Sequence, residues 1–259
     1  MKRLIIPFGA MAAVVAACAL GIAWHDCAGG ARMCATGIAA ESGRSLLLSA
    51  QLVGLVGLTA VFGRAGWLLI RASSLASRLP VGEAPVVLAA AATRAGLRGI
   101  ICVRADSCHA FTVGLLRPRV HVTDGLVAAL SADELIAVLC HEREHARGRH
   151  PLRQALRCAA GEVLFFLPVL RWWAGRQGER AEVAADGAAI AAVGRQAVAG
   201  ALWVTSDDAA VVGITPRLDQ LAGRRTRLTA PQRAVVLASF VGSLLAVVLL
   251  ACAATLMAG

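Results

Sequence analysis

Long apolar runs lie near both ends of the chain, whereas apolar, polar and charged residues are mixed through its middle part. Three of these runs reach the length of about 20 residues at which a helix crosses a bilayer. They cover residues 4–24, 46–70 and 234–257, and the second contains a single charged residue, Arg64. The pattern therefore predicts three transmembrane helices, two before and one after a domain with a hydrophobic core of its own.

Basic residues beside these runs predict the orientation of the chain, because positively charged flanks tend to stay in the cytoplasm. Lys2 and Arg3 precede the first run. The arginines that follow the second run are Arg71, Arg78, Arg94, Arg98 and Arg104. We therefore expect a multi-pass protein of the cell membrane. Its predicted parts are an N-terminal membrane region (1–78) with an outside loop (25–45), a cytoplasmic domain (79–231) and a C-terminal transmembrane helix (232–259).

Two features of the N-terminal region stay open at the level of sequence. The first apolar run follows basic residues and has small residues at Ala17 and Ala19, so it also fits a signal peptide that is removed. Cys27 and Cys34 lie in the predicted outside loop, where an oxidising compartment would allow a disulfide between them. The sequence decides neither question.

Composition supports the membrane assignment and narrows the choice of partners. The 259 residues are 58% hydrophobic with a mean hydropathy of +0.69, and 26 basic against 16 acidic residues give a net charge of +10. No aromatic interleaving and no helix-turn-helix or zinc-finger pattern accompanies this charge, so nucleic acid is not expected as a partner. Arg149, Arg153 and Arg157 recur every four residues and predict a basic helix face against an anionic lipid bilayer.

The segment "SADELIAVLCHEREHARG" predicts a helix over 132–147. Ser131 and Glu134 have the spacing of a capping box, and Gly148 is a typical stop. His141 and His145 are one turn apart and project from the same face, where both imidazoles can hold one metal ion. The alternative is a charged surface helix in which glutamate and arginine side chains pair with one another.

A second segment, "RAEVAADGAAIAAVG", predicts another helix, which ends at Gly194. Glu182 and Asp186 are again four residues apart, among alanines that favour close helix packing. Glu182 would complete a three-ligand zinc site with an open position, and Asp186 could accept the remaining N–H of a zinc histidine. The alternative is a pair of solvated acids. His150 lies half a turn away from the face of the zinc histidines, so we do not expect it to be a ligand.

The segment "HAFTVG" predicts a strand, with "RVHV" as its hairpin partner and His121 in a structural role. With helices on both sides of it in the sequence, the predicted fold is mainly α with a small β-sheet (α+β), combined with about three transmembrane helices.

In combination, "AFTVGLLRPRVHVTDGLVAALSADELIAVLCHEREHARGRHPL", "FFLPVLRWW" and "RAEVAADGAA" resemble the membrane-bound zinc metallopeptidases of the BlaR/MecR type, related to HtpX-like proteases. The resemblance implies a zincin-like domain and one zinc ion per chain. It implies the following roles: His141, His145 and Glu182 as zinc ligands, Glu142 as general base, Asp186 as support for a zinc histidine, and Ala110, Phe111 and Thr112 as an edge strand that pairs with the substrate backbone. No histidine follows His150, so Arg217 in "GITPRLDQL" is the candidate that stabilises the transition state.

Three functions fit these observations. The first is an integral membrane zinc endopeptidase in which Glu142 activates a zinc-bound water to cleave membrane or cytoplasmic proteins. The second is a signal transducer whose peptidase cleaves a transcriptional repressor, although the predicted outside loop of about 21 residues is short for a sensor. The third is a catalytically silent scaffold, which would have no need of Glu142. We favour the first.

Overall fold

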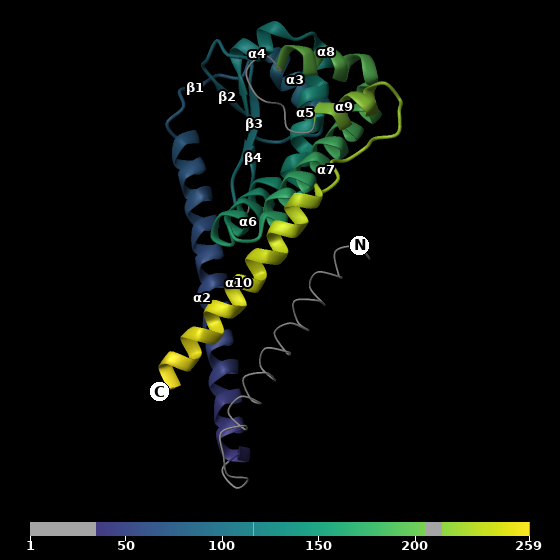
Figure 1. Ribbon diagram of the computed structural model, residues 1–259. Helices are drawn as coiled ribbons and strands as arrows, with labels where there is room; N and C mark the ends of the chain where they lie inside the picture. Colours follow the sequence, from purple (N-terminus) through teal and green to yellow (C-terminus); the bar gives the residue numbers. More distant parts are fainter. Residues whose placement is uncertain (1–34, 116, 206–213, 259) are drawn as a thin grey trace. The chain divides into compact units, whose positions relative to one another are not determined.

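The computed structural model describes residues 35–115, 117–205 and 214–258 (Figure 1). The chain divides into two compact units. One comprises residues 1–62, 160–172 and 231–259, and the other comprises residues 63–159 and 173–230. All predicted site residues fall in the second unit.

Helix α2 (Ala35–Ala76) is the first described element. It begins eleven residues before the predicted span at 46–70, so part of the segment predicted as an outside loop is helical, while the position of that segment outside the membrane stays a prediction. Within the described residues, one stretch of this helix, Gly54–Ala76, is long and apolar enough to cross a membrane. The apolar stretch in α10 (Arg233–Ala258) is shorter, covering Arg233–Val248.

The predicted span at 4–24 and the cysteine pair Cys27 and Cys34 lie outside the described residues. A single spanning candidate among the described residues gives weak support for a membrane protein, and the three-span arrangement stays a prediction.

A four-stranded mixed sheet forms one layer of the second unit, in the order β1-β2-β4-β3. Its strands are β1 (Val81–Gly82), β2 (Ile101–Val103), β3 (Ala110–Val113) and β4 (Arg119–Thr123). The β3 and β4 strands are antiparallel, which confirms the predicted hairpin, whereas β2 and β4 are parallel. Among the described residues β3 is therefore an edge strand.

The register of β3 decides which of its backbone groups face the free edge. The Thr123 N–H donates to the His109 carbonyl at 3.0 Å, which makes these two residues a hydrogen-bonded pair. Hydrogen-bonded and non-hydrogen-bonded pairs alternate along an antiparallel ladder. Ala110 and Thr112, opposite Val122 and Val120, thus direct their N–H and C=O groups away from β4.

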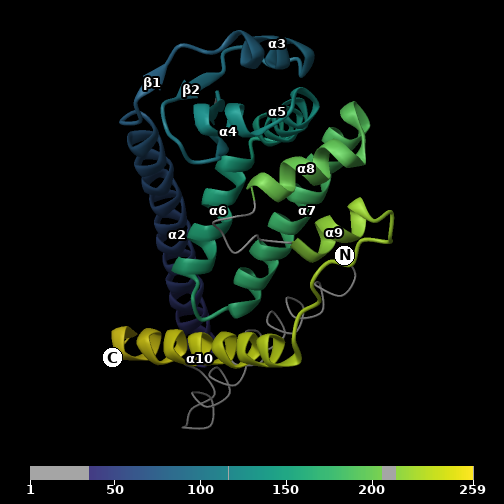
Figure 2. The same ribbon diagram turned by 90° about the horizontal axis from the view of Figure 1, so that it is seen from above.

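Helix α5 (Ala132–Arg147) is the central element of this unit and has the predicted bounds. Its capping box is complete, because the Ser131 and Glu134 side chains each bond the backbone N–H of the other residue. Leu135 and Leu139 are fully buried. The helix contacts α3 (Val86–Arg94), strands β3 and β4, and α8 (Arg195–Thr205), which together cover its apolar face. Figure 2 shows α5 between α3 and α8.

Three further helices carry residues that reach the site: α6 (His150–Val163), α7 (Pro168–Val193) and α9 (Ile214–Leu221). The short helix α4 (Asp124–Ala129) connects β4 to α5. As predicted, α7 ends directly before Gly194, which has a positive φ of 86° that glycine adopts without strain. The mixed sheet and the surrounding helices confirm the α+β prediction for this part of the chain.

One detail of the predicted basic face is wrong. Arg149 precedes α6 and has a φ of 48°, so it does not continue the helical repeat of Arg153 and Arg157. Gly148 and Arg149 are the only residues between α5 and α6.

Candidate metal centre and active site

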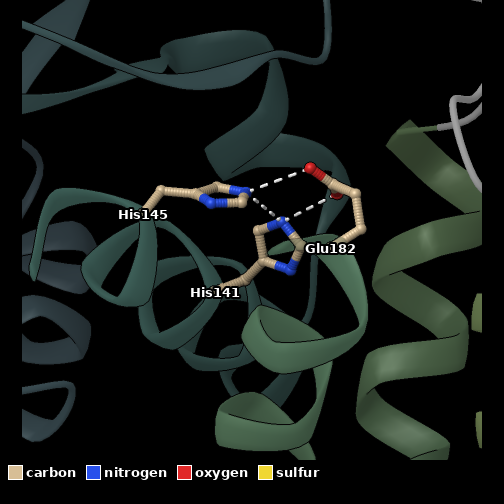
Figure 3. A group of neighbouring side chains, drawn as sticks. All are labelled: His141, His145 and Glu182. Carbon is tan, nitrogen blue, oxygen red and sulfur yellow. Dashed lines mark hydrogen bonds and ion pairs between the residues drawn. The ribbon is translucent and has the colours of Figure 1, made fainter. Parts of the chain in front are cut away.

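Two histidines of α5 and a glutamate of α7 converge on one point (Figure 3). The Nε2 atoms of His141 and His145 lie 3.0 Å apart. Glu182 places Oε2 3.4 Å from the Nε2 of His141 and Oε1 3.3 Å from the Nε2 of His145. Two ligands of one tetrahedral zinc, at bond lengths of about 2.0–2.1 Å, lie about 3.3 Å apart. The three side chains therefore lie at separations close to those of zinc ligands, with a different carboxylate oxygen of Glu182 facing each histidine.

The carboxylate of Asp186 bonds the ring nitrogen of His141 that does not face Glu182. Asp186 is fully buried, and its Oδ1 accepts a hydrogen bond from the Nδ1 of His141 at 2.9 Å. A proton held on Nδ1 leaves Nε2 free to bind a metal, which is the usual reason for such a partner.

Arg217 of α9 forms a bidentate pair with the same aspartate. Its Nε donates to Oδ2 at 2.6 Å and its Nη2 donates to Oδ1 at 2.9 Å. A third nitrogen, Nη1, lies 3.4 Å from the Oε2 of Glu182. The structure thus places the guanidinium between the carboxylates of Glu182 and Asp186, a contact that the sequence did not indicate because Asp186 and Arg217 are 31 residues apart.

The electrostatics of the cluster favour positive charge at His141. Burial opposes a charge on His141, but the hydrogen bonds that it donates to Asp186 and Glu182 outweigh this effect and raise its pKa to about 9. Burial likewise opposes ionisation of Glu182 and Asp186, yet the histidines, and Arg217 beside Asp186, hold the pKa of both carboxyl groups below its usual value. A divalent cation would meet the same stabilising field.

Glu142 lies beside the cluster and is tied to the edge strand. Its side chain is 7% exposed, and its Oε2 accepts a hydrogen bond of 2.7 Å from the hydroxyl of Thr112 on β3. The same hydroxyl lies 3.3 Å from the Glu142 carbonyl. Sequence reasoning assigned Thr112 to the substrate strand but gave no sign of this contact, which joins residues 30 positions apart.

The profile of peptidase family M48 matches residues 85–216. That range is just over half of the chain and includes both histidines, both glutamates and Asp186. The chain belongs to peptidase family M48. Peptidases of this family are zinc-dependent hydrolases, and the His141, His145 and Glu182 group agrees with that dependence.

The M48 assignment supports the predicted metallopeptidase and leaves its subtype, BlaR/MecR-type or HtpX-like, as a prediction. A comparison with curated proteins found no match to the chain. The matched range of this M48 peptidase ends one residue before Arg217, so the role of that arginine rests on its contacts alone.

One further residue of the M48 domain reaches the cluster without a role in the sequence prediction. His150, the first residue of α6, lies against His145, with their Nδ1 atoms 2.5 Å apart. Among the described residues, the group that could hold a metal ion comprises His141, His145 and Glu182, and His150 is not part of it.

Proposed function

We propose that the protein is an integral membrane zinc endopeptidase that hydrolyses peptide bonds of membrane or cytoplasmic proteins. The convergence of His141, His145 and Glu182 at tetrahedral spacing, with Glu142 next to the first histidine, carries this proposal. A scaffold without activity could use the zinc ligands, but it would have no need of the buried carboxylate of Glu142 beside them.

In this proposal His141, His145 and Glu182 hold one zinc ion. Bound there, zinc would supply a Lewis acid that polarises the scissile carbonyl and makes water a stronger acid. Glu142 accepts the proton of the attacking water and then donates it to the leaving amine, as a general base and acid. Thr112 fixes the Oε2 of Glu142, which leaves Oε1 to carry that proton.

The substrate is proposed to bind as an additional strand. The N–H and C=O groups of Ala110 and Thr112 face the free edge of β3, where an extended peptide can form backbone hydrogen bonds. Phe111 points to the other face and stacks on His121, with ring centroids 5.1 Å apart and planes within 3°. Such pairing would bind many sequences, and it places the peptide over the carboxylate to which Thr112 is bonded.

The order of elements along the chain favours substrates close to the membrane. Only four residues separate the end of α2 at Ala76 from the start of β1 at Val81, so the candidate span Gly54–Ala76 leads directly into the peptidase domain. Within that span, the Arg64 and Arg71 guanidinium groups lie 4.2 and 5.2 Å from the ring centroid of Trp67, so both cations lie against an aromatic ring.

Metal analysis and a protease assay on the full chain, purified in detergent without chelator, test the proposed function. We expect about one zinc per chain, as one three-ligand site implies. Cleavage of an unfolded protein such as casein should stop after metal removal and return with zinc but not with magnesium. His145→Ala should lack both zinc and activity. A wild-type protein that holds no zinc, and cleaves nothing when zinc is added, would overturn the proposal.

Thr112→Val is expected to lower kcat about tenfold and to leave KM and zinc content unchanged. Valine keeps the shape and strand propensity of threonine, so the backbone groups that pair with substrate stay in place. The lost hydroxyl frees Glu142 to leave its productive orientation, which affects the chemical step and not binding. Thr112→Ser keeps the hydroxyl and should retain most of the activity. Steady-state kinetics of the two variants distinguish this role from a purely structural one, which would affect both.

A further inference from the structure

We infer that His150 is a positioning residue, whose ring accepts a hydrogen bond from the Nδ1 of His145 and thereby directs the Nε2 of that histidine toward the metal. The inference rests on the zinc site of the proposed function. It assigns to the first residue of α6 a role that the spacing of the sequence motif does not indicate.

The two nitrogens of His145 have separate surroundings. Its Nε2 faces the Nε2 of His141 at 3.0 Å and the Oε1 of Glu182 at 3.3 Å, which is the metal side. Its Nδ1 faces the Nδ1 of His150 at 2.5 Å, and the two ring centroids are 4.8 Å apart at an angle of 59°. The rings are tilted and not stacked, and the two nitrogens face each other at a separation slightly shorter than that of an ordinary hydrogen bond.

The protons of this pair can be assigned. A neutral imidazole that binds metal through Nε2 carries its proton on Nδ1, so His145 is the donor. His150 must then accept through a bare Nδ1 and carry its own proton on Nε2. The same Nδ1 of His150 is directed at His145, so it is not available as a fourth metal ligand.

The arrangement gives each zinc histidine its own partner. Asp186 accepts from the Nδ1 of His141, and His150 accepts from the Nδ1 of His145. The partners differ in charge, because Asp186 is an anion paired with Arg217, whereas His150 accepts as a neutral ring. Partners of this kind fix the tautomer and ring orientation of a metal-bound histidine, and their loss weakens metal affinity.

The conformation of the backbone between α5 and α6 allows the contact between His145 and His150. A Cβ at Gly148 would come within 2.6 Å of the Nε2 and 2.8 Å of the Cδ2 of His150, so only glycine leaves room for the ring. Arg149 adopts a φ of 48°, a left-handed conformation that is unusual for a residue other than glycine or asparagine. Together these two residues turn the chain so that His150 lies against the last turn of α5.

The test measures zinc affinity, by competition with a chromophoric chelator, in the full chain, four single variants and one double variant. His150→Ala should bind zinc about 10- to 100-fold more weakly than wild type, the usual effect of removing such a partner. His150→Asn places an amide oxygen near the position of the lost Nδ1 and should recover most of the affinity. Gln154→Ala removes an exposed polar side chain one turn along α6 and is the matched control, with unchanged affinity.

Gly148→Ala provides an independent arm, because its new methyl group displaces the His150 ring without removing it. It should weaken zinc binding to a similar extent as His150→Ala, and the double variant should be no weaker than either single variant, since both remove the same contact. The visible spectrum of the cobalt-substituted protein should change in parallel, because it reports the orientation of the ligands.

The outcomes test the role of His150 and the proposed zinc site separately. Zinc affinity within twofold of wild type in His150→Ala overturns the role of His150 and leaves the zinc site intact. Additive losses in the double variant also overturn it, because they would show that Gly148 acts through another contact. A wild-type chain that binds neither zinc nor cobalt overturns both this role and the proposed function.

Discussion

Glu142→Gln is expected to lower kcat/KM for peptide cleavage by roughly two to four orders of magnitude, the range attributed to general acid–base catalysis. Glutamine has the shape of glutamate, and its amide oxygen can still accept the hydrogen bond from Thr112. The substitution therefore removes the proton acceptor and leaves the surrounding contacts in place. Zinc content should remain at the wild-type level, because Glu142 is not among the three residues that converge on the metal position.

Glu144→Gln is the matched control for that experiment. Glu144 is the other glutamate of the same helical turn, but it neither contacts Thr112 nor belongs to the candidate metal group. It should retain wild-type kinetics in the same casein assay. A Glu142→Gln protein with wild-type activity would show that the base is another residue. An inactive but zinc-loaded Glu142→Gln protein would instead be suitable for capturing bound substrates.

Local signals predicted the central helix well. The capping box at Ser131 and Glu134 and the stop at Gly148 define α5 from residues that are neighbours in sequence, and the helix has the bounds they imply. The same is true of the end of α7 at Gly194 and of the hairpin between β3 and β4. In each case the determinant lies within a few residues of the feature it sets.

Local sequence patterns did not predict the contacts between distant segments of the chain. The bonds from Thr112 to Glu142 and from Arg217 to Asp186 join residues about 30 positions apart, and no local pattern marks them. Arg217 was expected to stabilise a transition state, whereas its three nitrogens face the carboxylates of Asp186 and Glu182. The role of this arginine toward a substrate stays a prediction.

Two differences between the sequence prediction and the structure have local causes. Arginine is a good helix former, so the repeat of Arg149 with Arg153 concealed a break that falls on a residue seldom found at positive φ. The segment before residue 46 carries alanine and glutamate, which favour helix, and α2 accordingly begins at Ala35, before the apolar run. Hydropathy sets the length of a membrane span, but it does not limit the helix that contains it.

The charged residues of the candidate metal centre balance one another. Glu182 and Asp186 carry two negative charges, which Arg217 and the protonated His141 balance in the metal-free cluster. A divalent ion that replaces the proton of His141 would leave the cluster positive by one charge, beside the carboxylate of Glu142. Buried charges are tolerated when they are paired in this way. Removal of any one of them should therefore affect stability as well as chemistry.

Asp186→Ala is expected to lower the free energy of unfolding of the metal-free protein by about 3–5 kcal/mol, the cost of removing one partner of a buried ion pair. Asp186 is fully buried and makes two hydrogen bonds with Arg217, whose side chain is only 12% exposed. The substitution leaves this guanidinium without its main counter-charge and removes the acceptor for the Nδ1 of His141. Urea unfolding of the detergent-solubilised, metal-free chain measures the loss without a contribution from bound zinc.

Arg217→Met with Asp186→Ala is the control that separates charge from packing. Replacement of both partners removes the uncompensated charge, so the double variant should be more stable than Asp186→Ala alone. It should still bind zinc more weakly than wild type, because His141 lacks its partner in either background. A loss below 1 kcal/mol in Asp186→Ala would mean that Glu182, 3.4 Å from Nη1, already balances the guanidinium, and that the bidentate pair contributes little to folding.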